Sequence, residues 1–319
     1  MINEGSSGCT DIAAADRLYL SGGGPHVVVL KGDKVFACGD NSEYQLGNNT
    51  TVQSNELISI PGAGTSGVSL IAAGAGTSYV VKSGAIFGCG RNDYGQLSTG
   101  GASINKRVLT AGTLNAASGV TVIAASYRSM VALKGDAAYY CGWNAYGESG
   151  SSYTTVRDFL KPMEGVGTSG CTDIKCGRNT TFVLKGDAVF ACGYGTYGSL
   201  GNGGTLHKQF LTAMTGAGSS GCSAISVSRF TTLVLKGNSA YACGGNDNGQ
   251  ICDGTITQRN SLVAMINNGS NYVQQVSAGD HFSSCLRGYK PYAGGINISG
   301  QLANGTTIEK HEMTLCTSV

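Results

Sequence analysis

The stretch Leu184-Lys-Gly-Asp-Ala-Val-Phe-Ala-Cys-Gly193 carries the two marks that decide the fold. Its final Cys-Gly step recurs every 51 or 52 residues, at Cys38, Cys89, Cys141, Cys192 and Cys243, with a degenerate copy at Gly294-Gly295. Its opening Leu-Lys step keeps the same interval, with first residues Leu30, Val81, Leu133, Leu184, Leu235 and Leu286. Two independent marks at one spacing predict six copies of one supersecondary unit.

A single copy reads as four short strands. The sequence predicts them at Cys171–Gly177, Thr181–Leu184, Ala188–Cys192 and Phe210–Met214. The Lys-Gly-Asp connection between the second and third strands is typical of a hairpin, because glycine supplies a positive φ. No segment shows a sustained helical period. Four hairpin-linked strands per unit predict an all-β fold, a six-bladed β-propeller of four-stranded antiparallel blades.

The two ends of the chain leave the closure of the ring open. An ungapped register predicts a six-repeat propeller over 17–319 and an N-terminal extension over 1–16. Yet Gly8-Cys-Thr-Asp-Ile12 copies Gly170-Cys-Thr-Asp-Ile174 letter for letter, so it is either a strand of a repeat or a segment that adds to a blade edge. The segment Glu312–Val319 resembles a fourth strand. Terminal strands that met in one blade would seal the ring and hide two sheet edges.

Composition excludes several classes of partner. The chain has 51 glycines and 4 prolines among 319 residues, only 13% charged residues, and a net charge of +2. Without a basic run, we expect no nucleic-acid partner. The sequence has no stretch of about 18 apolar residues, so it predicts no membrane span. Its N-terminal residues do not resemble a signal peptide. We therefore expect a cytoplasmic or particle-associated protein that does not insert into a membrane.

The twelve cysteines do not predict a disulfide framework or a metal site. Five occupy one repeat position, and equivalent positions in neighbouring blades lie beyond the roughly 7 Å Cα limit for a disulfide. Cys171 and Cys222 share a second position, at which other copies have valine, so they behave as small hydrophobic residues. No Cys-X-X-Cys pair occurs, which argues against zinc. We expect most of the cysteines to be buried thiols, and we expect no metal and no cofactor.

The loops after the Cys-Gly step carry a family resemblance. The best copies are Gly39-Asp-Asn-Ser-Glu-Tyr-Gln-Leu-Gly47, Gly90-Arg-Asn-Asp-Tyr-Gly-Gln-Leu97, Gly244-Gly-Asn-Asp-Asn-Gly-Gln250 and Gly295-Ile-Asn-Ile-Ser-Gly-Gln-Leu302. Over residues 17–319 the pattern resembles the repeat of the regulator of chromosome condensation family, with Cys-Gly in place of the usual Trp-Gly. Kelch propellers share the repeat length, but their paired glycines and later tryptophan are missing in most copies. The resemblance implies a non-enzymatic platform that holds protein partners on a propeller face.

Residues that recur in every copy are expected to be structural. The glutamines Gln45, Gln96, Gln250 and Gln301 are predicted to brace the loop by bonding to its backbone. The recurring cysteines named above are repeat marks of the same kind, and so is one glycine series: Gly95, Gly147, Gly198, Gly249 and Gly300. A binding site should instead break the symmetry of the repeats.

One sector of the loops does break that symmetry. At the first and fourth positions after the Cys-Gly step, the second to fourth copies have Arg91, Tyr94, Trp143, Tyr146, Tyr194 and Tyr197. Clustered Trp, Tyr and Arg are the usual anchors of protein interfaces. These six residues are the candidate partner-binding residues. The alternative is that their rings pack between adjacent blades, as the family's tryptophan does.

The sequence contains no HExxH, GxSxG or GxxxxGK[ST] motif, and its four histidines fall at three different repeat positions. We expect no catalytic activity. The first functional hypothesis is a protein-binding scaffold. The alternative is a structural surface component of a virion, phage tail or cell appendage that also binds a host ligand. An exchange factor for a small GTPase is the third.

Overall fold

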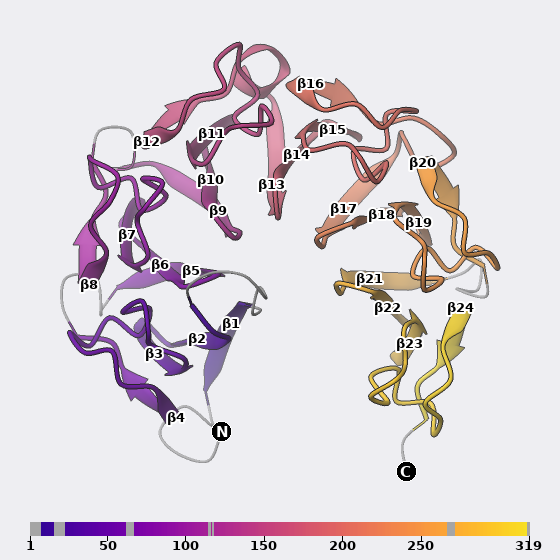
Figure 1. The fold of residues 1–319 in the computed structure, drawn as a ribbon, viewed down its shortest axis with the longest axis horizontal. Coiled ribbons are helices and arrows are strands. Elements are labelled where there is room, and N and C mark those ends of the chain that lie inside the picture. The colour runs from indigo at the N-terminus through magenta and orange to yellow at the C-terminus, as the bar shows by residue number, and fades with distance from the viewer. Residues whose placement is uncertain are drawn as a thin grey trace. The chain divides into compact units, whose positions relative to one another are not determined.

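The computed structural model describes residues 8–15, 23–61, 67–113, 116, 118–266 and 272–317 (Figure 1). The chain divides into two compact units. The first unit comprises Met1–Ala145 and Tyr153–Ser169, and the second comprises Tyr146–Ser152 and Gly170–Val319.

Three antiparallel sheets of four strands each form the first unit, and in each sheet the strands neighbour one another in chain order. The first sheet has β1 (Cys9–Ala15), β2 (His26–Lys31), β3 (Lys34–Gly39) and β4 (Ser54–Ser59). The second has β5 (Val68–Gly74), β6 (Thr77–Lys82), β7 (Ala85–Gly90) and β8 (Lys106–Ala111). The third has β9 (Val120–Ala125), β10 (Ser129–Lys134), β11 (Ala137–Gly142) and β12 (Arg157–Pro162), after which comes a short 3₁₀ helix, η2 (Gly165–Thr168).

The second unit repeats this arrangement in three further sheets. The fourth sheet has β13 (Cys171–Gly177), β14 (Thr180–Lys185), β15 (Ala188–Gly193) and β16 (Lys208–Ala213). The fifth has β17 (Cys222–Val227), β18 (Thr231–Lys236), β19 (Ser239–Gly244) and β20 (Arg259–Ala264). The sixth has β21 (Val273–Ala278), β22 (Phe282–Arg287), β23 (Lys290–Gly295) and β24 (Lys310–Leu315).

The strands predicted for the reference copy are confirmed. The first, Cys171–Gly177, is β13 without change, and the other three match β14, β15 and β16 to within two residues at either end. Every sheet also has an irregularity in the register between its first and second strands, which the sequence did not predict. In the fourth sheet Cys171 pairs with Lys185 and Asp173 with Leu184, so that Thr172 is the extra residue of a β-bulge.

The N-terminal segment is a strand of a repeat, which is one of the two alternatives that the sequence left open. In β1, Cys9 pairs with Lys31 and Asp11 with Leu30, the same bulged register as in β13. The connection to β2 covers residues 16–25, whereas residues 178–179 suffice between β13 and β14. An ungapped register cannot accommodate this longer connection. From the sequence we expected the first repeat to start at residue 17. That residue belongs to the segment 16–22, which lies outside the described residues.

At the other end, the predicted fourth strand is confirmed as β24, which pairs with β23. It completes a sheet with β21, β22 and β23, whereas β1 belongs to a sheet with β2, β3 and β4. The two terminal strands therefore lie in different sheets, and the idea that they meet in one blade is wrong.

The second strand of each sheet forms much of the core. In β6, β10, β14 and β18 the first five residues are all buried, and only the final lysine is partly exposed. These strands are rich in Val, Leu and Thr, which suit a pleated surface covered on both faces. Eight of the twelve cysteine side chains are also buried, as expected for small apolar residues.

Candidate partner-binding site

The Cys-Gly step fixes the backbone at the start of each loop. The six glycines of this step have φ between 101° and 116°, a region that favours glycine. The N–H of the residue after each glycine donates to a carbonyl in the turn between the first and second strands, at 2.8–3.0 Å. A Cβ on Gly193 would lie 2.3 Å from that carbonyl oxygen of Asn179. The residue after the step, which differs between copies, therefore stands at one backbone position in all six.

The recurring cysteines are structural. The thiols of Cys89, Cys141, Cys192 and Cys243 are fully buried, and each donates to the backbone carbonyl of the residue at the glutamine position in the preceding repeat, at 3.2–3.6 Å. Burial raises the pKa of Cys89 to about 12. A thiol that stays protonated at neutral pH is a poor nucleophile.

The bracing role predicted for the glutamines is confirmed. The Oε1 atoms of Gln45, Gln96, Gln250 and Gln301 each accept the N–H of the residue two positions before, at 2.9 Å. Glu148 does the same in the third repeat with Oε2, which accepts the N–H of Tyr146 at 2.9 Å. Each loop thus has its own internal brace, which keeps the neighbouring variable side chains in place.

In the first unit, three of the candidate residues meet in one group. The rings of Tyr94 and Trp143 contact edge to face, with centroids 4.9 Å apart. The guanidinium of Arg128 lies 4.8 Å from the centre of Tyr94, 4.5 Å from Tyr127 and 5.2 Å from Trp143. Arg91 is buried and paired with a carboxylate, Asp93, at 2.5 Å. We call Arg91, Tyr94, Tyr127, Arg128 and Trp143 the first cluster.

In the second unit, the other three candidates form a second cluster with His207 and Phe230. The centroids of Tyr146 and Tyr194 are 5.0 Å apart, and His207 stacks on Tyr194 at 4.8 Å with an interplanar angle of 28°. Tyr197 meets Phe230 edge to face at 4.5 Å. Each such aromatic pair contributes about 0.5–1.5 kcal/mol beyond its buried area.

The rings pack between repeats, and part of their surface is exposed. The contacts between Tyr94 and Trp143, and between Tyr197 and Phe230, join the loops of successive repeats, as the family's tryptophan was expected to do. The rings nevertheless reach the surface, because Tyr94, Trp143, Tyr146 and Tyr194 are half-buried and Tyr197 is 37% exposed. The clusters therefore contribute to packing between repeats and also present exposed ring surface.

The fourth repeat departs from the others beside Tyr194. Five repeats have a fully buried asparagine two residues after the Cys-Gly step, and its amide bonds the loop backbone; these are Asn41, Asn92, Asn144, Asn246 and Asn297. The fourth repeat has Gly195, where a Cβ would lie 2.4 Å from the carbonyl oxygen of Leu206. The N–H of Gly195 donates to Nδ1 of His207 at 3.1 Å, which directs the imidazole toward Tyr194.

A pocket opens beside the second cluster, with a volume of about 240 Å³. It lies between the loops after β11 and β15 and the turns before β14 and β18. Its lining consists of Tyr146, Arg178, Asn179, Thr180, Tyr194, Tyr197, Arg229 and Phe230. We call it the arginine–tyrosine pocket.

The sequence did not single out Arg128, His207, Arg229 or Phe230. Arg128 and Phe230 stand at one position of the turn between the first and second strands, which also differs between copies. The divergence criterion applied to the loops would have found this turn as well. His207 had no such signal, because its role depends on the glycine at position 195.

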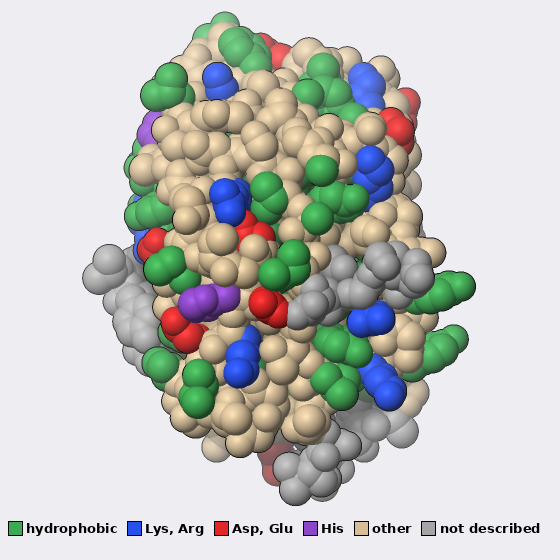
Figure 2. Space-filling model, turned by 90° about the vertical axis from the view of Figure 1, so that its right-hand side faces the viewer, with side chains coloured by type: hydrophobic (Ala, Val, Ile, Leu, Met, Phe, Trp, Pro, Cys, Tyr) green, Lys and Arg blue, Asp and Glu red, His purple; other side chains and the backbone are tan. Residues whose placement is uncertain are grey.

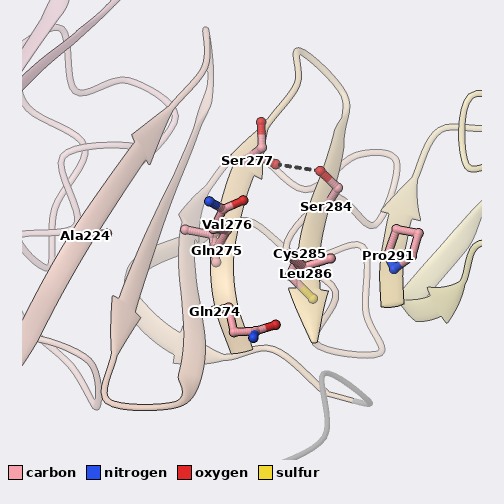
Figure 3. A pocket seen from close by; sticks show the side chains of 9 residues that line it. All are labelled: Ala224, Gln274, Gln275, Val276, Ser277, Ser284, Cys285, Leu286 and Pro291. Atoms are coloured by element: carbon pink, nitrogen blue, oxygen red, sulfur yellow. Dashed lines mark hydrogen bonds between the residues drawn. The ribbon is translucent and has the colours of Figure 1, made fainter. Parts of the chain in front are cut away.

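A second hollow lies on the sixth sheet and has a volume of about 400 Å³. Figure 3 shows the residues that line it, among them Gln274, Gln275 and Ser277 on β21 and Ser284 on β22. The hydroxyl of Ser284 donates to the carbonyl of Ser277 at 3.4 Å. The residues that line this groove are all uncharged, so it offers no electrostatic basis for selecting a ligand.

Charged side chains are sparse on the surface. Figure 2 shows one side of the molecule, where Lys and Arg alternate with Asp and Glu among uncharged atoms and hydrophobic side chains lie in small groups. Among the described residues, no group of three or more His, Cys, Asp or Glu side chains is placed to hold a metal ion. No helix in the described ranges has the length and hydropathy needed to cross a bilayer.

A histidine–serine contact in the first unit lacks access for a substrate. The Nε2 atom of His26 lies 2.9 Å from the Oγ atom of Ser78, and the Ser78 hydroxyl donates to the carbonyl of Gln45 at 2.6 Å. Ser78 is fully buried and His26 is 2% exposed. This geometry fits a structural role for His26.

Known proteins resemble the chain in sequence. No protein-family model matches it. It is 26% identical over 242 residues to the ultraviolet-B receptor UVR8 of Arabidopsis thaliana, covering 73% of this chain and 53% of the receptor. It is 28% identical over 193 residues to human HERC4, a probable E3 ubiquitin-protein ligase, covering 57% of this chain and 18% of HERC4. The chain thus spans about half of the plant receptor and less than a fifth of the ligase.

Solved structures share the fold. Human WBSCR16 superposes with a TM-score of 0.79 at 17% identity, over 97% of this chain and 82% of that one. Yeast RCC1 (Prp20), solved bound to Kap60, gives a TM-score of 0.78 at 17% identity, over 98% of this chain and 75% of that one. Together with the six four-stranded sheets and the repeated loop pattern, these similarities show that the chain has the fold of a six-bladed β-propeller and resembles RCC1-like repeat proteins.

Proposed function

We propose that this propeller is a non-catalytic protein-binding scaffold, and that the first cluster and the second cluster each offer a docking surface to a protein partner. The observation that carries the proposal is that half-exposed Trp, Tyr and Arg side chains gather where the repeats diverge, on loops that are otherwise braced alike. Trp, Tyr and Arg are enriched among the residues that dominate protein–protein affinity. Rings that are already packed against one another also lose little side-chain entropy on binding.

The relatives support this class of function. The yeast structure holds RCC1 in complex with Kap60, and a second yeast structure, of Prp20p from Saccharomyces cerevisiae, is described together with its binding to Gsp1p and histones. Those partners belong to those proteins, because a shared fold does not transfer a specific partner. The relatives named here give no support to the alternative of a particle component.

The proposal is tested by site-specific crosslinking. A photoreactive phenylalanine analogue replaces Tyr197 in the full chain, and a second chain carries it at Phe210 on β16, an aromatic residue that is 49% exposed and lies outside both clusters. We expect the probe at Tyr197 to crosslink one partner and the probe at Phe210 to crosslink none. The captured partner is then purified and titrated against the unmodified chain.

The titration decides whether the clusters contribute binding energy. Tyr197→Ala should weaken partner binding at least tenfold, about 1.4 kcal/mol, whereas Phe210→Ala should leave it unchanged. Circular dichroism verifies that each variant is folded. If a folded Tyr197→Ala variant binds the partner as tightly as the parent chain, the second cluster is structural and the proposal is wrong.

A further inference from the structure

We propose that the arginine–tyrosine pocket receives an acidic side chain, aspartate or glutamate, of a protein partner. This inference rests on the proposed scaffold function and names the chemical group that the second cluster selects. Two arginines, Arg178 and Arg229, line the pocket, and none of the eight lining residues is acidic. Two cations that share one hollow attract an anion more strongly than either does alone.

Arg229 is the residue of the pocket best placed to bind a carboxylate. Its guanidinium lies 4.4 Å from the centre of the Phe230 ring, which holds it at the pocket. Within the described part of the chain it forms no ion pair, whereas Arg91 pairs with Asp93 at 2.5 Å and Arg259 with Asp253 at 2.5 Å. The Nε atom of Arg229 is buried without a hydrogen-bond partner among the described residues. A half-buried arginine in this state gains a charge-assisted hydrogen bond when a carboxylate arrives.

The walls strengthen such a contact. Tyr146, Tyr194, Tyr197 and Phe230 line the pocket beside the two arginines. An ion pair near a protein surface is stronger than one in bulk water. Thr180 and Asn179 add polar groups to the lining that can orient a bound carboxylate.

The size of the pocket favours a side chain over a free metabolite. Its volume is about 240 Å³. Small-molecule sites are usually larger, about 300–1,000 Å³. The second cluster beside the pocket offers the apolar contact area that a protein partner needs around a single charged anchor.

The test uses a synthetic probe, so that it does not depend on the natural partner. Fluorescein-labelled decaglutamate is titrated into the full chain at low salt, with decaglutamine as the uncharged control, and binding is followed by fluorescence polarisation. We expect decaglutamate to bind, and decaglutamine to bind at least tenfold more weakly. Arg229→Gln should weaken decaglutamate binding at least tenfold, and Arg229→Lys should restore part of it, because lysine keeps the charge but loses the planar fork.

The matched control is Arg287→Gln. Arg287 also lies over an aromatic ring of the second unit, 5.4 Å from the centre of Tyr292, but outside the pocket. The Arg287→Gln variant should bind decaglutamate as tightly as the parent chain does. An equal loss in Arg287→Gln and Arg229→Gln, or no loss in a folded Arg229→Gln variant, overturns the proposal. Arg178→Gln provides a second variant should Arg229→Gln fail to fold.

Three further outcomes are distinguishable. If a phosphoserine peptide of equal charge binds at least tenfold more tightly than decaglutamate, the site selects phosphate and the carboxylate proposal is wrong. If the crosslinked partner depends on Tyr197 but binds Arg229→Gln unchanged, the acidic-anchor inference fails while the scaffold function stands. If the probe binds through Arg229 but a folded Tyr197→Ala variant binds the partner unchanged, the pocket stands and the scaffold proposal fails.

Discussion

His26 illustrates how a single buried residue couples the fold to pH. Desolvation by burial lowers its pKa from 6.5 to about 4, although backbone hydrogen bonds at Thr77 and Gly24 and the charge of Asp40 oppose the shift. The folded protein therefore holds a neutral imidazole where the unfolded chain takes up a proton. Between pH 6.5 and pH 4 the unfolded state binds more protons, so the free energy of unfolding falls as the pH is lowered.

We expect His26→Gln to remove this part of the pH dependence. The pKa shift of His26 from 6.5 to about 4 corresponds to about 3 kcal/mol in the free energy of unfolding. Most of this stability is lost as the pH falls from 7 to 4. Urea unfolding at several pH values in this range measures it for the parent chain and the variant. The control is His311→Gln, because His311 is half-exposed and bonded to Glu309. Parallel pH profiles for the parent chain and His26→Gln would refute the assignment.

At the scale of single residues, the sequence predicted roles that are purely local. The glutamine brace spans two residues of one loop, so its spacing is visible in the chain. The burial of Arg91 and its pairing with Asp93 were not predicted, because burial depends on what the neighbouring repeat supplies, here Tyr127. His207 was missed for the same reason, since its neighbour Tyr194 is 13 residues away in the chain.

At the scale of the elements, the recurring loop glycines show how one repeat packs on the next. Gly95 has φ +70°, and a Cβ there would lie 2.4 Å from the Cα atom of Asp158 on β12. Gly300, in the sixth repeat, has φ +72° and nothing within 4 Å of the same position. The two glycines share a conformation but differ in packing, so they form a matched pair.

Gly300→Ala should therefore cost only the conformational penalty, about 1–2 kcal/mol, because alanine is strained at positive φ. Gly95→Ala should cost more than about 4 kcal/mol, since the methyl group must also displace the backbone of β12. Chemical denaturation of both variants measures the difference. Equal losses of stability would mean that the loop and β12 are not packed as closely as described.

Strand β1 marks the limit of periodic reasoning at this scale. Its sequence, Cys9-Thr-Asp-Ile12, identified it as a possible repeat strand, and its bulged register with β2 confirms this. The connection over residues 16–25 shifted it out of the common period. Hydrogen bonds between strands tolerate such an insertion, because the cost of closing a longer loop grows slowly with its length.

For the whole molecule, the division into two compact units predicts unfolding that is not fully cooperative. The single tryptophan, Trp143, belongs to the first unit, so its fluorescence reports that unit alone. Far-UV circular dichroism reports the strands of both units. We expect the urea transitions followed by fluorescence and by circular dichroism to differ in midpoint. Gly95→Ala should lower the fluorescence midpoint more than the circular dichroism midpoint. Coincident transitions in the parent chain and the variant would instead show one cooperative body.

By itself, the sequence determined the number of repeats, the four strands of each and the loops in which the repeats diverge. It could do so because glycine turns, hairpins and braces are local backbone requirements, and six copies make each requirement visible six times. Only the tertiary structure decided that β1 belongs to the first sheet and that the six candidate residues form two clusters. It alone placed Arg229 and Phe230 beside Tyr197 around a pocket. The physical reason is that these contacts join side chains from different repeats, whose chain separation varies and leaves no periodic mark.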